Sequence, residues 1–88
     1  GLGDYFIELK NKHLKNPDFI VENQNKVVEI ISFKELLFRG NNNSQEYIQK
    51  ITKDYNDVGY KVLPILEIDI KNNIENVKQR IIEFIKEN

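Results

Sequence analysis

The spacing of apolar positions changes along this chain, and these changes predict the order of its elements. Four stretches are rich in β-branched and aromatic residues and are predicted to be strands: residues 5–9, 18–22, 26–33 and 60–66. Residues 44–58 and 74–85 instead carry apolar side chains at helical spacing and are predicted to be helices. Residues 34–40 are ambiguous and fit one helical turn. The pattern therefore predicts three strands, a helical segment, a fourth strand and a closing helix.

Residues with special backbone preferences mark the ends of these elements. Residues 23–25 read Asn-Gln-Asn and predict a tight hairpin turn, because Asn tolerates the left-handed region. Ser44 is a candidate N-cap for the first long helix, and Gly59 is its predicted stop. Pro64 has no N–H to donate to a ladder, so its strand is predicted to lie at an edge or to contain a bulge.

The predicted order gives an α/β fold class, with a small mixed β-sheet of about four strands flanked by helices. Residues 26–33 are almost continuously apolar, which is typical of a central strand covered on both faces. Tyr47 and Tyr55 lie on the apolar stripe of the 44–58 helix. We predict that both belong to the core and are not base-stacking platforms.

Composition limits the classes of protein that fit. The chain has 88 residues, a formal net charge of −1 and no Cys, so we expect one domain over residues 1–88. The absence of Cys excludes a disulfide-stapled scaffold, a Cys-ligated zinc site, an iron–sulfur cluster and thiol catalysis. The sequence starts Gly-Leu-Gly-Asp without Met, and we expect a domain excised from a longer protein.

Two carboxylates in neighbouring strands are the first candidates for chemistry. A tight turn places Glu22 opposite Lys26. In that register Asp18 pairs near Ile30, one position away from Glu29, and a bulge or slip could bring the two acids together. Mg²⁺ binds through one or two carboxylates plus phosphate oxygens, so the pair is a candidate site for Mg²⁺ or Mn²⁺. The alternative is that Glu29 simply faces solvent or pairs with a Lys.

The chain resembles the very-short-patch-repair-like nucleases, a branch of the PD-(D/E)xK nucleases that includes homing endonucleases. The resemblance lies in a basic turn followed by Pro-Asp-Phe (residues 12–19), Asn-Lys-Val-Val-Glu (residues 25–29), the Gly-Tyr segment (residues 59–70) and the closing helix. It covers nearly the whole chain in the right order. It implies a restriction-endonuclease-like core.

The resemblance also implies roles for individual residues. Asp18 and Glu29 match the metal-binding acidic positions, with Mg²⁺ or Mn²⁺ as the cofactor. Lys15 and Arg39 match basic residues that contact or support the phosphate. The densest basic cluster, which includes Lys12 and His13, adds candidate DNA contacts. The alternative for His13 is an exposed turn residue, and for the lysines simple solvation.

Several departures from the family pattern concern the catalytic residues. Phe38 stands where the family has a histidine, so the expected general base is missing. Ile31 occupies the position at which a Glu-x-Lys pattern needs its lysine, and Lys34 reaches the site only if the chain bends. The family also takes a glutamate from a helix upstream of the first strand, which this sequence does not contain.

The leading hypothesis is a metal-dependent endonuclease domain of homing or repair type that hydrolyses DNA phosphodiester bonds. Asp18, Glu29 and Lys34 would be its catalytic residues. We expect double-stranded DNA as the partner, a recognition domain elsewhere in the parent protein, a possible homodimer and an intracellular location. Two alternatives remain: a catalytically degenerate nucleic-acid-binding or assembly module on the same fold, and a generic α/β domain with an accidental likeness.

Overall fold

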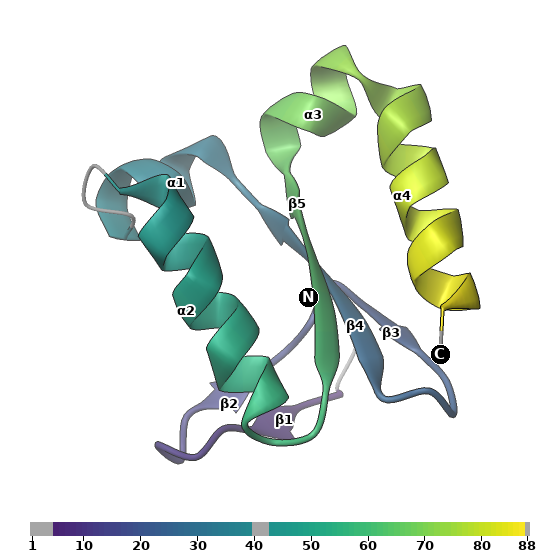
Figure 1. Cartoon of the computed structure of the whole chain (residues 1–88). Helices are drawn as coiled ribbons and strands as arrows, with labels where there is room; N and C mark the ends of the chain where they lie inside the picture. The colour runs from purple at the N-terminus through teal and green to yellow at the C-terminus, as the bar shows by residue number, and fades with distance from the viewer. Residues whose placement is uncertain (1–4, 40–42, 88) are drawn as a thin grey trace.

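The computed structural model describes residues 5–39 and 43–87 and contains five strands and four helices within them. The strands are β1 (Ile7–Glu8), β2 (Leu14–Lys15), β3 (Phe19–Val21), β4 (Lys26–Ile31) and β5 (Lys61–Leu66). The helices are α1 (Phe33–Arg39), α2 (Ser44–Asn56), α3 (Glu67–Asn72) and α4 (Ile74–Lys86). Figure 1 shows their arrangement, a small mixed α/β domain. No described helix is long and apolar enough to cross a membrane.

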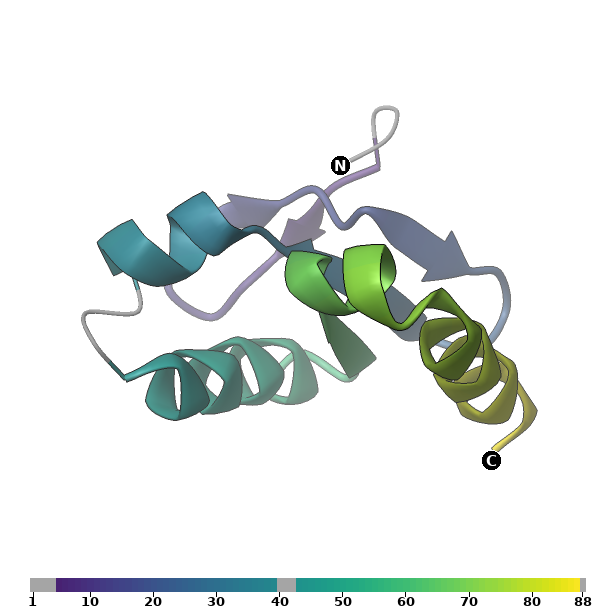
Figure 2. The same cartoon turned by 90° about the horizontal axis from the view of Figure 1, so that it is seen from above.

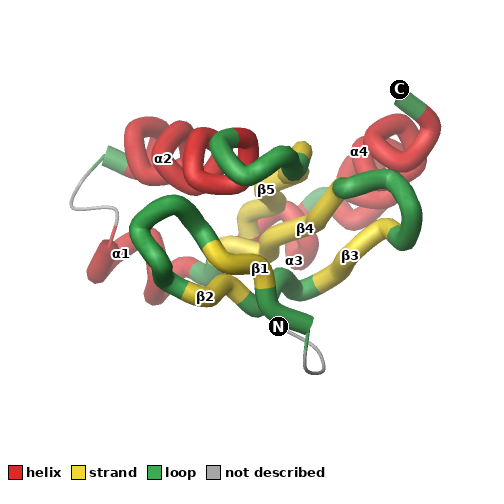
Figure 3. Tube along the Cα trace, turned by 90° about the horizontal axis from the view of Figure 1, so that it is seen from below, coloured by secondary structure: helices red, strands yellow, loops and turns green. Residues whose placement is uncertain are grey.

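The strands form two sheets, which corrects the predicted single sheet of about four strands. The order in the larger sheet is β3-β4-β5, with β3 antiparallel and β5 parallel to β4. β1 pairs instead with β2, a strand that lies between the predicted strands at residues 5–9 and 18–22. The reason is local, because the chain reverses through Lys12 at φ 73°, and the Leu9 N–H donates to the His13 carbonyl. Figure 3 shows this hairpin beside the larger sheet.

Helices cover both faces of the three-stranded sheet. The β4–β5 crossover runs through α1 and α2, and α2 and α4 lie on opposite sides of the two strands (Figures 1 and 2). The core on the α2 side also includes β1 and consists of five buried side chains: Ile7, Val27, Ile31, Ile51 and Tyr55. The core on the α4 side has four: Val28, Ile65, Val77 and Phe84.

β4 is the central strand, as its apolar run predicted, and five of its six residues are buried. Because side chains alternate between faces, Glu29 shares the α2 face with Val27 and Ile31. Lys26 shares the α4 face with Val28. The strand therefore carries one buried charged side chain toward each helix layer.

The β3–β4 hairpin differs by one residue from the predicted register. Val21 pairs with Lys26, so the loop has four residues, with Asn23 and Asn25 at positive φ. Two left-handed residues in one loop let the chain reverse over four residues. Continuing this register by one residue places Asp18 opposite Glu29. Residues directly opposite one another share a face, so the observed register brings the two acids together.

The observed helix ends agree with some of the predicted ends and differ from others. The N-cap of α2 is Asn43, one residue before the predicted Ser44, and its side chain accepts from the Glu46 N–H at 3.0 Å. Gly59 has φ 89° and follows the end of α2, as predicted. Residues 34–39 of the ambiguous segment belong to the seven-residue helix α1, which starts at Phe33, a residue predicted to end the preceding strand; residue 40 lies outside the described residues. Ser32 Oγ caps it by accepting from the Glu35 N–H at 3.0 Å.

Pro64 lies in an edge strand, as its missing N–H predicted. The Lys61 N–H donates to the Asn25 carbonyl on the β4 side, so alternation turns Pro64 toward the open edge of β5. Arg80 of α4 donates to the Pro64 carbonyl at 3.1 Å. The middle of this edge therefore offers no free N–H to another strand, which is a common protection against edge-to-edge pairing.

Candidate functional site

A pocket of about 580 Å³ opens between the start of β3, the second half of β4 and α1. Its lining combines acidic, basic and aromatic side chains from these elements and from β2: Lys15, Asn16, Asp18, Glu29, Ile30, Ser32, Lys34, Glu35, Phe38 and Arg39. Three of these are acidic and three are basic. The pocket thus gathers Asp18, Glu29, Lys34, Lys15 and Arg39, which are five of the seven residues selected from the sequence.

Asp18 and Glu29 enter the pocket from adjacent strands. Asp18 Oδ2 accepts a hydrogen bond from the Ile30 N–H at 2.7 Å, which ties the start of β3 to β4. Glu29 is only 8% exposed, and its Oε1 accepts from the Tyr55 hydroxyl at 2.8 Å. Each carboxylate therefore has one oxygen fixed by a donor from the fold.

The charge state of Glu29 depends on its surroundings. Burial raises the pKa of its carboxyl above the ordinary value of 4.5, because a buried charge loses hydration. The Tyr55 hydrogen bond and the positive charge of Lys15 oppose this increase, whereas the negative charges of Asp18 and Glu35 add to it. A cation placed in the pocket would favour the ionised form, since opposite charge lowers a carboxyl pKa.

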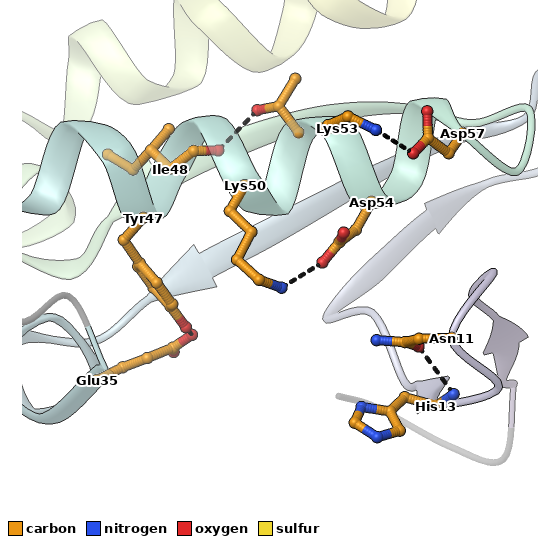
Figure 4. Close-up of polar contacts among 10 residues, drawn as sticks. Asn11, His13, Glu35, Tyr47, Ile48, Lys50, Lys53, Asp54 and Asp57 are labelled. Carbon is orange, nitrogen blue, oxygen red and sulfur yellow. Dashed lines mark hydrogen bonds and ion pairs between the residues drawn. The ribbon is translucent and has the colours of Figure 1, made fainter.

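Glu35 is a third acidic residue in the pocket, and α2 holds it through a second tyrosine. The Tyr47 hydroxyl donates to Glu35 Oε2, and Figure 4 shows the two side chains meeting between α2 and α1. Burial and this contact raise the pKa of Tyr47 to about 12, so the hydroxyl keeps its proton near neutral pH. The two tyrosines of α2 thus donate to two different acids of the same pocket.

Basic side chains reach the pocket because the chain bends after β4. Ile31 ends the strand, and α1 starts at Phe33, which brings Lys34 and Arg39 to the pocket lining. The bend that Lys34 requires is therefore present. Lys15 comes to the pocket from a different element, β2. A phosphate in the pocket would meet positive charge from both β2 and α1.

Lys12 and His13 do not line this pocket. They lie in the connection from β1 to β2, where both are exposed, and Lys12 Nζ is 4.0 Å from Glu8 Oε2. The His13 backbone N–H donates to Asn11 Oδ1 at 3.0 Å, a contact within one loop (Figure 4). The structure therefore separates these two residues from the acidic pair, and their role as DNA contacts stays a prediction.

The two departures from the family pattern occupy different environments. Phe38 lines the pocket and is 76% exposed, so an aromatic ring without a titratable group stands where the resemblance places a histidine. Ile31 is 1% exposed and packs in the core on the α2 side. A lysine at position 31 would bury its ammonium among apolar side chains. In this chain Lys34 of α1 and Lys15 of β2 are the lysines that line the pocket.

The acids in the pocket limit which cations fit. Within residues 5–39 and 43–87, no group of three or more His, Cys, Asp and Glu side chains is arranged to hold a metal ion. Asp18 and Glu29 would supply two carboxylates. That number suits Mg²⁺ or Mn²⁺, which usually keep several waters and take further oxygens from a substrate phosphate. It does not suit a site that relies on protein ligands alone, such as structural zinc.

Two residues of this site escaped sequence analysis. Glu35 follows Ser32 at the spacing of a capping box, and this spacing is a signal for the start of α1, the helix that carries Glu35. Tyr55 was correctly assigned to the core. A buried tyrosine hydroxyl usually needs a partner, and that need was the available clue to its contact with Glu29.

Comparisons with known proteins add no family to this description. No protein-family model matches the chain, and neither a curated protein nor a solved structure matches it.

Proposed function

We propose that this chain is the catalytic domain of a metal-dependent DNA endonuclease with a restriction-endonuclease-like core. One observation carries the proposal: a single pocket gathers Asp18 and Glu29 with the basic residues Lys15, Lys34 and Arg39. Acidic side chains that hold a divalent metal ion, next to basic side chains that hold a phosphate, are the groups that metal-dependent phosphodiester hydrolysis uses. The parallel β4–β5 pair and the helices on both faces suit such a core.

The residues divide into two roles. Asp18 and Glu29 would hold Mg²⁺ or Mn²⁺, which supplies charge stabilisation at the phosphate and lowers the pKa of an attacking water. Lys34 would neutralise the phosphate at the reacting centre, and Lys15 and Arg39 would hold the neighbouring phosphates. Lys12 and His13 would contact phosphates of the duplex outside the pocket. Contacts of this kind position DNA without reading its sequence.

The proposed partner is double-stranded DNA. Specific protein–DNA interfaces typically bury about 1,000 Å² or more of protein surface, which is a large area for a domain of 88 residues. Sequence recognition would therefore come from another domain of a longer protein. A homodimer would place two such pockets on opposite strands.

A catalytically degenerate module is the second candidate, and the environment of Phe38 favours it. This exposed ring lines the pocket at the position where the resemblance places the general base. A phenyl ring cannot accept a proton from water. In this alternative the basic residues still bind phosphate, but no bond is broken.

Cleavage of supercoiled plasmid DNA in Mg²⁺ or Mn²⁺ tests the proposal. Asp18→Asn removes one charge from the proposed ligand pair. We expect it to lower the cleavage rate about 100-fold or more, because metal charge stabilisation contributes several kcal/mol and 1.36 kcal/mol is a factor of ten. Asp54→Asn is the matched control, since Asp54 pairs with Lys50 within α2 (Figure 4) and does not line the pocket, so its rate should equal the wild-type rate.

The outcomes separate the two candidates. Cleavage that persists unchanged in Asp18→Asn contradicts the enzyme hypothesis. No cleavage by the wild type, together with DNA binding that Lys34→Gln and Arg39→Gln weaken, supports the degenerate module instead. That binding should fall steeply with salt, because phosphate contacts release counterions.

A further inference from the structure

Tyr55 places a hydroxyl group inside an apolar core. Its side chain is 0% exposed and packs with Val27, Ile31 and Ile51 on the α2 side of the sheet. A phenylalanine ring would fill nearly the same volume without a polar atom. Burying a hydroxyl without a hydrogen bond costs about 1–3 kcal/mol, so this group needs a partner to be tolerated.

That partner is the carboxylate of Glu29. The Tyr55 hydroxyl donates to Glu29 Oε1 at 2.8 Å, and the bond joins the last turn of α2 to the middle of β4. Burial raises the pKa of Tyr55, so the hydroxyl stays protonated and acts as a donor. Both groups are buried, which makes this contact stronger than a similar one at the surface.

The geometry divides the Glu29 carboxylate between two environments. Oε1 is engaged by Tyr55 on the core side, whereas Glu29 also lines the pocket next to Asp18. A single donor at one oxygen restricts rotation of the carboxylate, and it leaves the second oxygen, Oε2, as the ligand atom for the pocket. Outer partners of metal ligands commonly orient them in this way.

We propose that Tyr55 is a positioning residue: its hydroxyl fixes Glu29 so that Oε2 faces Asp18 and a divalent cation in the pocket. This inference rests on the proposed function of the pocket as a metal site. Tyr55 itself does not touch the cation or the DNA. Its effect is on the affinity for the cation, which a purely structural hydrogen bond would leave unchanged.

Binding of Mn²⁺, followed by the electron paramagnetic resonance signal of the free ion, tests the inference without any cleavage. Tyr55→Phe keeps the ring and removes the donor, and we expect it to weaken Mn²⁺ binding about tenfold, as other outer partners do. Tyr60→Phe is the matched control, because the Tyr60 hydroxyl meets Tyr5 and not the pocket. Its affinity for Mn²⁺ should equal that of the wild type.

A double variant shows whether the effect passes through Glu29. In a Glu29→Gln background, Tyr55→Phe should cause no further loss of Mn²⁺ affinity, because the ligand that Tyr55 positions is already impaired. An additional tenfold loss there contradicts the inference, since it shows that Tyr55 acts by another route. Thermal unfolding of each variant separates a loss of affinity from a loss of fold.

Each outcome of the titration decides one question. A wild type that binds no Mn²⁺ overturns the proposed metal site. Equal Mn²⁺ affinities of the wild type and Tyr55→Phe overturn the positioning role alone. If Tyr55→Phe does not fold, tyrosine absorption in the near ultraviolet is the second measurement. Mg²⁺ added to the wild type should change this absorption, whereas Mg²⁺ added to Glu29→Gln should not. An unchanged wild-type spectrum despite Mn²⁺ binding also overturns the positioning role.

Discussion

β4 contains two buried charged residues that the fold treats differently. Lys26 starts the strand on the α4 face, and Glu29 lies three residues later on the α2 face. Lys26 Nζ donates to the carbonyls of Phe84 at 2.6 Å and Ile85 at 3.4 Å, and also to that of Glu87. Glu29 has one hydrogen bond from a side chain, from Tyr55, and borders a pocket.

The difference shows how a buried charge can be assigned to structure or to function. The last carbonyls of a helix have no partner within the helix, so a cation placed there satisfies them and also interacts favourably with the helix dipole. Lys26 satisfies these carbonyls at the end of α4, and the small cavity of about 280 Å³ that it also lines is formed with Gln24 and the last residues of the chain around that helix end. Glu29 is instead held at the margin of a space where a ligand can enter. The contacts of Lys26 therefore indicate a structural role, whereas the position of Glu29 at the pocket is the one that the proposed function uses.

The largest expected effect on stability is that of Lys26→Met. The variant keeps most of the side-chain volume but leaves the carbonyls at the end of α4 without their donor. We expect the free energy of unfolding in urea to fall by about 1.5–3 kcal/mol, the range for hydrogen bonds to charged groups. Mn²⁺ affinity of the folded fraction should not change, because Lys26 lies outside the pocket.

Lys71→Met is the control for this substitution. Lys71 is exposed in α3, so its replacement should change the free energy of unfolding by less than about 0.5 kcal/mol. Equal effects of the two variants would remove the distinction between a lysine that docks α4 and a lysine at the surface.

Glu29→Gln should have a smaller effect of the opposite sign in metal-free protein. The pKa of Glu29 is raised in the folded state, so its contribution to stability is complete below the ordinary value of 4.5 and is lost as pH rises through the folded pKa. Gln does not ionise and avoids this loss. The variant should therefore unfold at a higher urea concentration than the wild type at pH 7, and the difference should shrink toward pH 4.5.

The comparison with Glu22→Gln controls for loss of a negative charge. Glu22 is exposed in the β3–β4 loop, so its variant should follow the wild type within about 0.5 kcal/mol at both pH values. A Glu29→Gln variant less stable than the wild type at pH 7 would show that Glu29 is a structural residue like Lys26.

The smallest expected effect is that of Phe84→Leu, which divides the Lys26 contacts further. Lys26 Nζ lies 5.3 Å from the centre of the Phe84 ring, a cation–π distance. We expect a loss of about 1 kcal/mol in the free energy of unfolding. This loss should be smaller in a Lys26→Met background, where the cation is absent. Phe19→Leu is the exposed control, and in either background it should lower the free energy of unfolding by less than Phe84→Leu does.

Sequence patterns predicted the long elements of this fold but not its short ones. The apolar run of β4, the stripes of α2 and α4 and the stop at Gly59 were all sufficient signals. β2 has only two residues and depends on its partner, so it has no local signal. Residues 67–72 alternate apolar and charged side chains in a strand-like pattern, yet they form α3, where Ile70 packs against the core on the α4 side. The secondary structure of these segments therefore depends on tertiary packing and not on local sequence.

The candidate site was predictable as a set of residue types but not as an arrangement. The position of Glu29 in an apolar strand was a clear signal, and the pocket gathers it with Asp18 and Lys34. Whether the two acids share a face depends on a one-residue difference in the hairpin, which the turn sequence did not determine. The contact with Tyr55 spans 26 positions along the chain, and only the tertiary fold reveals it.

The hairpin register also has a consequence for the order in which the site forms during folding. Asp18 and Glu29 are joined by a short antiparallel hairpin, so they meet through contacts that are local in the chain. β5 pairs with β4 in parallel across 35 positions, from Lys26 to Lys61, and Tyr55 lies within that crossover. Contacts at longer separation carry a larger entropy of loop closure and form later on average. We therefore expect the acidic pair to meet before the Tyr55–Glu29 contact forms, because that contact needs the β4–β5 crossover to close.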